Sequence, residues 1–243
     1  MHDYFGEDVA ARYDESSAGE FDPVVIDPTV DFLQTLAGDG AALELGIGTG
    51  RIALPLAARG VPVSGIELSE AMTAQLRRKP GSGDIPVAIG DFATTRVDGT
   101  FRLVYLVFNT IGNLTTQDQQ VDCFGNAAAH LEPGGTFVIE VGVPSLQWLA
   151  PGETVIPFHV SDERIGFDEY DVANQGLISH HLEITPDGRA IRNSIPFRYA
   201  WPAEYDLMAR LAGMRLQERY SGWRREPYTS TSHKHVSVWR NDT

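Results

Sequence analysis

Residues 44–51 read Glu-Leu-Gly-Ile-Gly-Thr-Gly-Arg, and this stretch decides the fold. It ends an apolar run, 41–47, that has the composition of a buried strand, and it leads into the helical pattern of 51–59. Glycines allow the backbone to turn tightly and to approach a ligand closely, and the N-terminus of the following helix favours negative charge. The stretch therefore predicts a strand, a ligand-binding loop and a helix.

Two other interpretations of this loop need to be weighed. The first is a glycine-rich turn that binds nothing. The second is the loop of a nucleotide-binding oxidoreductase, whose fingerprint is G-x-G-x-x-G. Arg51 stands where the third glycine of that fingerprint would be, and this difference disfavours NAD as a ligand.

On the carboxyl side of this loop, strand patterns alternate with helix patterns. We expect further strands at 61–67, 85–89, 101–108 and 136–141, and helices at 69–79 and 117–131. The strands are continuous apolar runs, which is typical of parallel strands covered on both faces. Residues 41–144 therefore predict a doubly wound, Rossmann-like α/β core.

The flanking segments have different patterns. Residues 1–40 predict a helical arm or lid, with a helix that begins at Asp27-Pro28. In 145–200 the apolar residues alternate by two, and Thr185-Pro186-Asp187-Gly188 is a hairpin signal, so we expect an inserted antiparallel cap for substrate. Residues 201–243 complete the core sheet with a helix from Pro202 and strands at 214–220 and 234–240.

The cap strands each have one apolar face. In 177–184 that face carries Ile178, His180, Leu182 and Ile184, and in 191–199 it carries Ile191, Ile195, Phe197 and Tyr199. We expect His180, Phe197 and Tyr199 to border an acceptor pocket.

Composition narrows the classes of partner. The chain has 243 residues with 33 acidic and 19 basic side chains, a net charge of −14, which disfavours nucleic acid and membrane surfaces. No apolar run approaches the roughly 20 residues of a membrane span, and a single cysteine, Cys123, excludes an intrachain disulfide. We expect a cytoplasmic protein that acts on a small molecule, either as a monomer or as a homo-oligomer.

Two further motifs follow the next two strands. Glu67 ends the second strand, 21 positions after Gly46, where a carboxylate can accept hydrogen bonds from both hydroxyls of a ribose. Gly90-Asp91-Phe92 follows the third strand, where Asp91 can meet an adenine amino group and Phe92 can pack on the ring. Taken singly, Glu67 also fits a solvated carboxylate, and Gly-Asp is a common turn.

The chain resembles the class I S-adenosylmethionine (AdoMet)-dependent methyltransferases, in particular the small-molecule members common in actinomycetes. The resemblance is carried by three motifs in this order: E-L-G-I-G-T-G-R, G-I-E-L-S-E-A-M and G-D-F. The resemblance implies a seven-stranded sheet whose last strand is antiparallel. It also implies that AdoMet lies across the carboxyl ends of the strands and leaves as S-adenosylhomocysteine.

The resemblance also implies roles for individual residues. The methionine part of the cofactor is assigned to Glu44, Gly46, Gly48, Thr49 and Gly50, the ribose to Glu67, and the adenine to Leu68, Met72, Asp91 and Phe92. Phe108 and Asn109 close the side of the fourth strand. Tyr13, in a segment similar to the family's A-x-x-Y-D element, is assigned to the cofactor carboxylate together with Tyr4 and Arg51, and is also a candidate catalytic residue.

The reaction itself is an in-line displacement at a methyl group, for which the protein must align and desolvate the nucleophile. A neutral amine needs little general base, whereas a hydroxyl often needs histidine, a carboxylate or a metal. His180 is the candidate base or substrate anchor, although a hydrogen-bonded core histidine fits the pattern equally, and no third ligand joins His233 and His235 to make a metal site. We expect small-molecule N-methylation, with O-methylation, C-methylation and a non-catalytic AdoMet-binding module as alternatives.

Overall fold

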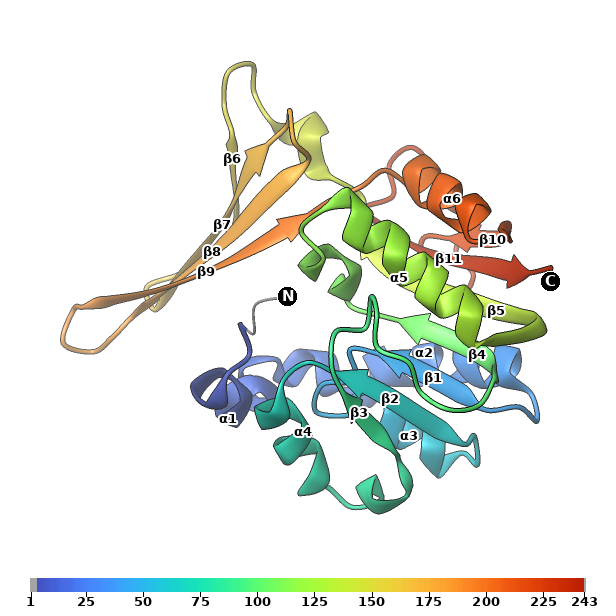
Figure 1. Ribbon diagram of the computed structural model, residues 1–243. Coiled ribbons are helices and arrows are strands. Elements are labelled where there is room, and N and C mark those ends of the chain that lie inside the picture. Colours follow the sequence, from blue (N-terminus) through green and yellow to red (C-terminus); the bar gives the residue numbers. More distant parts are fainter. Residues whose placement is uncertain (1–3, 243) are drawn as a thin grey trace.

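The protein is described by a computed structural model covering residues 4–242, in which two sheets are joined by helices (Figure 1). The larger sheet has seven strands in the order β3-β2-β1-β4-β5-β11-β10. Its strands are β1 (Ala42–Leu45), β2 (Val63–Glu67), β3 (Val87–Ile89), β4 (Phe101–Leu106), β5 (Leu131–Gly142), β10 (Met214–Tyr220) and β11 (Lys234–Asn241). The first five run parallel, and β11 is antiparallel to both β5 and β10. The predicted seven-stranded sheet with an antiparallel last strand is confirmed.

Helices cover both faces of this sheet. They are α1 (Glu7–Ser16), α2 (Pro23–Ala37), α3 (Ala53–Ala58), α4 (Glu70–Arg77), α5 (Gln117–His130) and α6 (Pro202–Leu211), with short 3-10 turns η1 (Ala18–Phe21), η2 (Ser82–Asp84), η3 (Thr110–Asn113) and η4 (Ser145–Trp148). Neighbouring strand residues therefore join different apolar clusters. Leu43 packs in the cluster that contains Phe124 of α5, and Ala42 packs in the cluster that contains Leu33 of α2. Burial on both faces explains why the strands read as continuous apolar runs.

Some predicted boundaries are wrong. Helix α2 begins at Pro23 rather than Pro28, because the side chain of Asp22 caps it by accepting a hydrogen bond from Val24 N at 2.8 Å. Two Asp-Pro pairs offer the same local signal, and tertiary packing of the whole segment selects the first. Strand β5 begins at Leu131, because Leu131 pairs with Phe101 and a register shift follows.

The smaller sheet is antiparallel and is inserted between β5 and α6. Its strands are β6 (Val155–Val160), β7 (Arg164–Asp171), β8 (Gly176–Ile184) and β9 (Ala190–Arg198), and they pair in that order. The predicted hairpin at 185–188 is present, with Gly188 N donating to Thr185 O at 2.8 Å. The sheet projects from the body at the left of Figure 1, on the same side as α1.

A buried polar network ties the base of this smaller sheet to the body. Arg198, at the end of β9, pairs with Glu204 of α6 at 2.6 Å and donates to Gln120 Oε1 of α5 at 2.6 Å. The amide of Gln120 in turn donates to Arg198 O at 3.1 Å. Because Arg198 and Gln120 are buried and the three groups satisfy one another, they hold the root of the smaller sheet in one orientation.

The register of β8 and β9 corrects an expectation about the cap. Ser179 pairs with Ile195 and Leu177 pairs with Phe197, and directly opposed residues lie on the same face. Side chains alternate along a strand, so His180 lies on the face opposite Phe197. The prediction that His180, Phe197 and Tyr199 border one pocket is therefore wrong. Alternation identifies which residues share a face, but it does not relate the faces of two strands whose register is unknown.

We call these two surfaces the inner face and the outer face. The inner face carries Asp168, Ser179, His181, Glu183, Ile195 and Phe197, and the outer face carries Ile178, His180, Leu182 and Ile184. The inner face meets the body, because a Cβ on Gly112 of η3 would lie 3.2 Å from Phe197 and Glu183 pairs with Arg12 of α1 at 3.8 Å. On the outer face, Ile178 is 39% exposed and Ile184 is 36% exposed.

Residues 4–242 contain no helix with the length and apolar composition that crossing a bilayer requires. The same residues bring no group of three His, Cys, Asp or Glu side chains together in a way that could hold a metal ion.

Candidate active site

A cavity of about 80 Å³ lies at the carboxyl ends of β1, β2 and β4, beneath the N-terminal segment. It is lined by Tyr4, Phe5, Tyr13, Gly46, Gly48, Glu67, Leu68, Met72, Phe92, Thr110 and Asn113. All three sequence motifs contribute to this wall. Parallel strands end at one edge of an open α/β sheet, which is where ligands of such folds bind.

The glycine loop forms one wall of the cavity. Gly46 and Gly48 have φ values of +71° and +56°, in the left-handed region that favours glycine. Both Gly46 N and Ile47 N donate to Ile66 O, at 2.8 and 3.1 Å, and this ties the loop to β2. A Cβ on Gly46 would lie 2.7 Å from Thr110 Cγ2, so a side chain would fill the space that the loop leaves open.

Glu67 enters the cavity from the end of β2 and is 8% exposed. Its two carboxylate oxygens accept hydrogen bonds from Gly48 N at 2.8 Å and from Ser69 N at 2.9 Å. Ser69 is also the N-cap of α4, where its hydroxyl accepts a hydrogen bond from Met72 N. The carboxylate is therefore held in one orientation by the loop and by the start of a helix.

Glu44 is buried and does not line the cavity. Tyr105 donates its hydroxyl to Glu44 Oε2 at 2.9 Å. Burial raises the pKa of Glu44 to about 8, although the hydrogen bond from Tyr105 and the charge of Arg51 oppose that rise. Glu44 is therefore mostly a neutral acid at pH 7, and its position is that of a buried support for the loop.

Arg51 also lies beside the cavity without lining it. Its guanidinium stacks over the Phe108 ring at 4.8 Å, and Nη1 donates to Glu20 O at 3.3 Å. Within residues 4–242, no carboxylate forms an ion pair with Arg51. Arg51, at the end of the glycine loop, therefore presents a positive charge that remains available to an anionic ligand.

The other predicted residues outside the cavity wall make structural hydrogen bonds. Thr49 donates to Asp14 at 2.6 Å, Asp91 accepts from Ala93 N at 2.8 Å, and Asn109 accepts from Gly142 N at 2.6 Å. Gly50 has a φ of +83° and packs against Leu76. These residues shape the loops around the cavity.

The N-terminal segment forms the roof. Ser69 donates its hydroxyl to Phe5 O at 2.7 Å, and the rings of Phe5 and Tyr13 are 6.2 Å apart. Asp14 of α1 pairs with Lys79 at 2.5 Å. Burial raises the pKa of Tyr13, so its hydroxyl stays protonated at neutral pH even though the charge of Arg51 opposes the shift.

The structure adds residues that sequence reasoning missed, of which Asn113 is the most informative. Its Nδ2 donates to Thr110 O at 3.2 Å, whereas its Oδ1 is buried with no hydrogen-bond partner among the described residues. Asn113 belongs to the turn that follows β4, so a polar residue just after a strand end was the available signal. Phe5 and Thr110 carried no comparable signal.

His180 lies elsewhere. On the outer face of the smaller sheet its Nδ1 is 2.9 Å from both Ser194 Oγ and an Arg192 nitrogen, and its Nε2 is 3.1 Å from Glu169 Oε2. The ring is 2% exposed and does not line the cavity. Both nitrogens are engaged, which is the arrangement of a structural histidine.

A family model described as a methyltransferase domain matches residues 42–135 of this chain. The solved structure of the CcbJ methyltransferase from Streptomyces caelestis is 36% identical to it in sequence, with complete coverage of both chains and a TM-score of 0.88. The chain belongs to the class I AdoMet-dependent methyltransferases. Its cofactor is AdoMet.

Two further methyltransferases are similar to this chain over most of its length. A cypemycin N-terminal methyltransferase from Streptomyces is 26% identical over 93% of this chain and 96% of its own. An AdoMet-bound amino pentose methyltransferase from Micromonospora echinaspora has a TM-score of 0.73 at 23% identity, covering 94% of this chain and 96% of its own, and shares the fold. The cavity of this methyltransferase fits the cofactor in its chemistry, since it offers an oriented carboxylate, a glycine cradle and a nearby unpaired cation.

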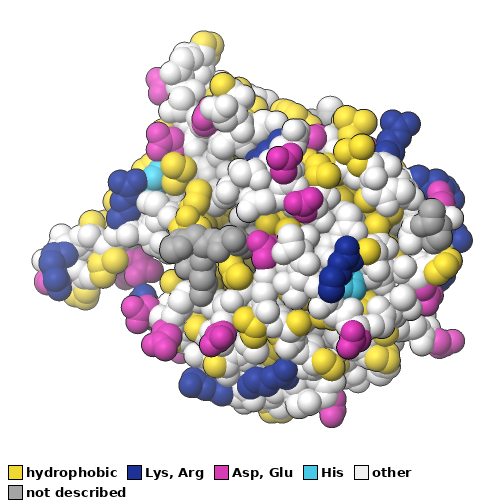
Figure 2. Space-filling model, in the orientation of Figure 1, with side chains coloured by type: hydrophobic (Ala, Val, Ile, Leu, Met, Phe, Trp, Pro, Cys, Tyr) yellow, Lys and Arg dark blue, Asp and Glu magenta, His cyan; other side chains and the backbone are white. Residues whose placement is uncertain are grey.

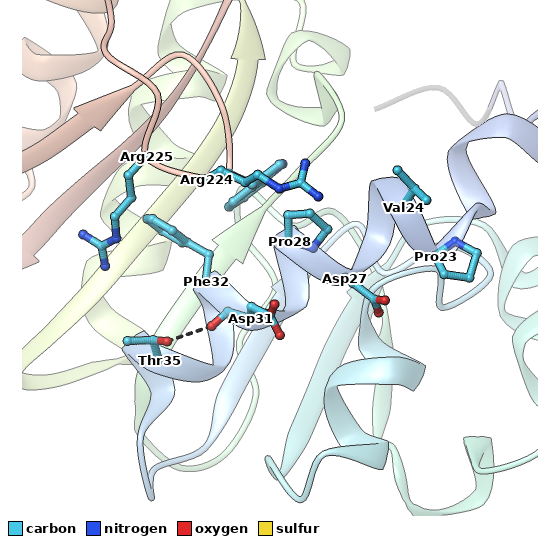
Figure 3. Close-up of a pocket in the computed structure, with 10 residues that line it drawn as sticks. Pro23, Val24, Asp27, Pro28, Asp31, Phe32, Thr35, Arg224 and Arg225 are labelled. Atoms are coloured by element: carbon cyan, nitrogen blue, oxygen red, sulfur yellow. Dashed lines mark hydrogen bonds between the residues drawn. The ribbon is translucent and has the colours of Figure 1, made fainter.

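A larger groove of about 510 Å³ is present on the surface of the methyltransferase, between α2 and the loop after β10 (Figure 3). Arg224 and Arg225 reach over α2 from that loop, and the Arg225 guanidinium lies 5.1 Å from the centre of the Phe32 ring. The groove shares no lining residue with the motif-lined cavity. Its size alone does not make it the active site.

We expect the N-terminal segment to act as a lid. Pockets for drug-sized ligands usually hold about 300–1,000 Å³, well above the volume beneath the roof, so the segment must move outward for the cofactor to enter. Hydrogen exchange measured with and without S-adenosylhomocysteine should show greater protection of residues 4–16 in the complex. Equal protection in the two states would contradict the lid.

Proposed function

We propose that this methyltransferase transfers the methyl group to an amine nitrogen of a small molecule. The observation that carries the proposal is the character of the cavity wall, where Asn113 offers a buried carbonyl acceptor and no described lining residue is a histidine. An amine nucleophile needs an acceptor for its N–H but little general base. The relatives named for an N-terminus and for an amino pentose support the same class of acceptor.

We assign the cofactor contacts by matching the charge, hydrogen-bonding groups and apolar surface of each residue to the parts of AdoMet. Glu67 accepts hydrogen bonds from the ribose hydroxyls, and Arg51 pairs with the cofactor carboxylate. Leu68, Met72 and Phe92 surround the adenine, and Gly46 and Gly48 allow the backbone to approach the methionine part. When bound, AdoMet supplies an electrophilic methyl group on a positively charged sulfur.

The chain's own residues then orient and enclose the acceptor. Asn113 Oδ1 accepts a hydrogen bond from the amine N–H, which leaves the lone pair free for in-line attack. Tyr13 keeps its proton and serves as a hydrogen-bond donor rather than a base, because burial raises its pKa. The N-terminal segment excludes water once it closes, which strengthens these polar contacts.

The proposal is tested with labelled AdoMet and a matched panel of acceptors. Amino sugars, a short peptide with a free N-terminus, benzylamine and tyramine are compared with phenols and with benzyl alcohol. We expect mass spectrometry to find products methylated at nitrogen. Methylation of phenols alone, with no amine product, would refute the proposal and favour the O-methyltransferase alternative.

His180→Ala separates a base from a structural histidine. We expect the melting temperature to fall by several degrees, because loss of a buried hydrogen-bonded group costs about 1–3 kcal/mol and each kcal/mol shifts a domain of this size by about 2–4 °C. Turnover by the folded variant should stay close to wild type. Lost turnover with retained cofactor affinity and partial rescue at higher pH would instead identify His180 as a base.

A further inference from the structure

The inner face of the smaller sheet is a mixed surface. It carries the polar side chains of Asp168, Ser179 and His181 beside the apolar side chains of Leu177, Ile195 and Phe197. Polar groups turned toward a protein interior cost free energy unless they find partners, and apolar residues normally take the buried side. The inner face is therefore unlike a hydrophobic core and resembles a surface that meets a polar ligand.

This inner face contacts η3 and α1, two elements that contribute residues to the cofactor cavity. At one end Phe197 packs over Gly112 of η3, the turn that also carries Thr110 and Asn113. At the other end Glu183 pairs with Arg12 of α1, the helix that carries Tyr13. Ser179 lies on β8 between Leu177, which pairs with Phe197, and Glu183, and Asp168 is directly opposite Ser179 on β7.

Asp168 is a half-buried carboxylate on the inner face of the smaller sheet. It stands directly opposite Ser179, and burial raises its pKa, although hydrogen bonding by Ser179 and the charge of His180 oppose that rise. Among residues 4–242 it forms no ion pair. Arg164, four positions away on β7, contacts His181 Nδ1 at 2.8 Å, and Arg12 pairs with Glu183. Phe158, 5.4 Å from the His181 ring, and Phe197 add aromatic surface to the same face.

We propose that Asp168 determines acceptor specificity by binding the protonated amine of the acceptor as it enters, while Phe158 and Phe197 pack against the carbon skeleton of the acceptor. The inference rests on the proposed N-methylation. Amines are mostly protonated at neutral pH, so a half-buried carboxylate on the face turned toward the body selects them over neutral alcohols. The bound ammonium group then releases its proton to water, and the neutral amine with its free lone pair is the species that attacks the methyl group. Aromatic rings beside an ammonium group add to that preference. Figure 2 shows hydrophobic side chains on the projecting sheet and on the body beside it.

Calorimetry on the S-adenosylhomocysteine complex tests this selection with benzylamine and benzyl alcohol, which differ mainly in charge. We expect the wild type to bind benzylamine about tenfold or more tightly than the alcohol, and Asp168→Asn to lose that preference. Glu169→Gln changes the next residue, on the outer face, and should keep it. An equal preference in Asp168→Asn and wild type, or no binding of benzylamine by wild type, would overturn the inference.

Kinetics with the amine acceptors of the panel separate this inference from the proposed function. Asp168→Asn should raise KM about tenfold and change kcat little, with unchanged affinity for S-adenosylhomocysteine and an unchanged melting temperature, and Asp168→Glu should restore part of the loss. Amine turnover with an unaltered KM in Asp168→Asn refutes the role of Asp168 alone. Exclusive methylation of phenols by wild type refutes N-methylation and the inference together.

Discussion

Replacing Glu67 with alanine is expected to weaken the binding of S-adenosylhomocysteine by about 10- to 150-fold. The substitution removes the carboxylate to which we assign the ribose hydroxyls, and it also leaves Gly48 N and Ser69 N without their present acceptor. Charge-assisted hydrogen bonds contribute about 1.5–3 kcal/mol, which corresponds to that range of affinity. Isothermal titration calorimetry measures the change directly.

Two further variants control for indirect effects. Glu67→Gln keeps the shape and one acceptor oxygen, so its loss should be smaller than that of Glu67→Ala. Glu70→Ala removes an exposed carboxylate from the first turn of α4, three residues away, and should leave the dissociation constant unchanged. A folded Glu67→Ala protein with wild-type affinity would place the ribose elsewhere.

Gly50→Ala is expected to lower the free energy of unfolding by about 2–5 kcal/mol. A residue with a side chain at φ +83° costs about 1–2 kcal/mol, and the added Cβ would lie 2.4 Å from Leu76 Cδ1 in a buried site. Overpacking of this kind costs about a further 1–3 kcal/mol. The total is a large part of the roughly 5–15 kcal/mol that stabilises a typical protein.

Gly60→Ala provides the matched control. Gly60 has a similar φ of +89°, but a Cβ there would meet nothing within 4 Å. It should therefore lose only the backbone contribution of about 1–2 kcal/mol, and the difference between the two variants measures the packing of α4 against the loop. Urea unfolding curves supply both values, and equal losses would contradict the role of Leu76.

Much of the cofactor cavity was predictable because its sequence signals are local. Gly46 and Gly48 adopt positive φ values, which favour glycine. Ser69 caps the helix that follows it directly, and Glu67 ends a strand that an apolar run marks. Each of these features depends on neighbours within a few positions in the chain. The seven-stranded sheet with an antiparallel last strand followed from the family resemblance, and the larger sheet confirms it.

The acceptor half was less predictable because its arrangement depends on distant contacts. Nothing near Phe5 in the chain signals that its carbonyl accepts a hydrogen bond from Ser69, and nothing near Asn113 signals that its Oδ1 is buried without a partner. Phe5 and Ser69, for example, are 64 positions apart in the chain. Hydrophobic periodicity and turn residues report only on neighbouring positions, so they do not predict a contact of this kind.

The sequence by itself determined the class of fold, the glycine loop, the position of Glu67 and the existence of an antiparallel insertion, because hydrophobic periodicity and turn residues act over short distances. Only the tertiary structure decided which face of that insertion turns inward. A period of two defines two faces for each strand, but the register between β8 and β9 and the contacts with Gly112 and Arg12 choose between them. That choice turns His180 outward and Asp168 inward, since side chains one position apart on paired strands must point to opposite sides.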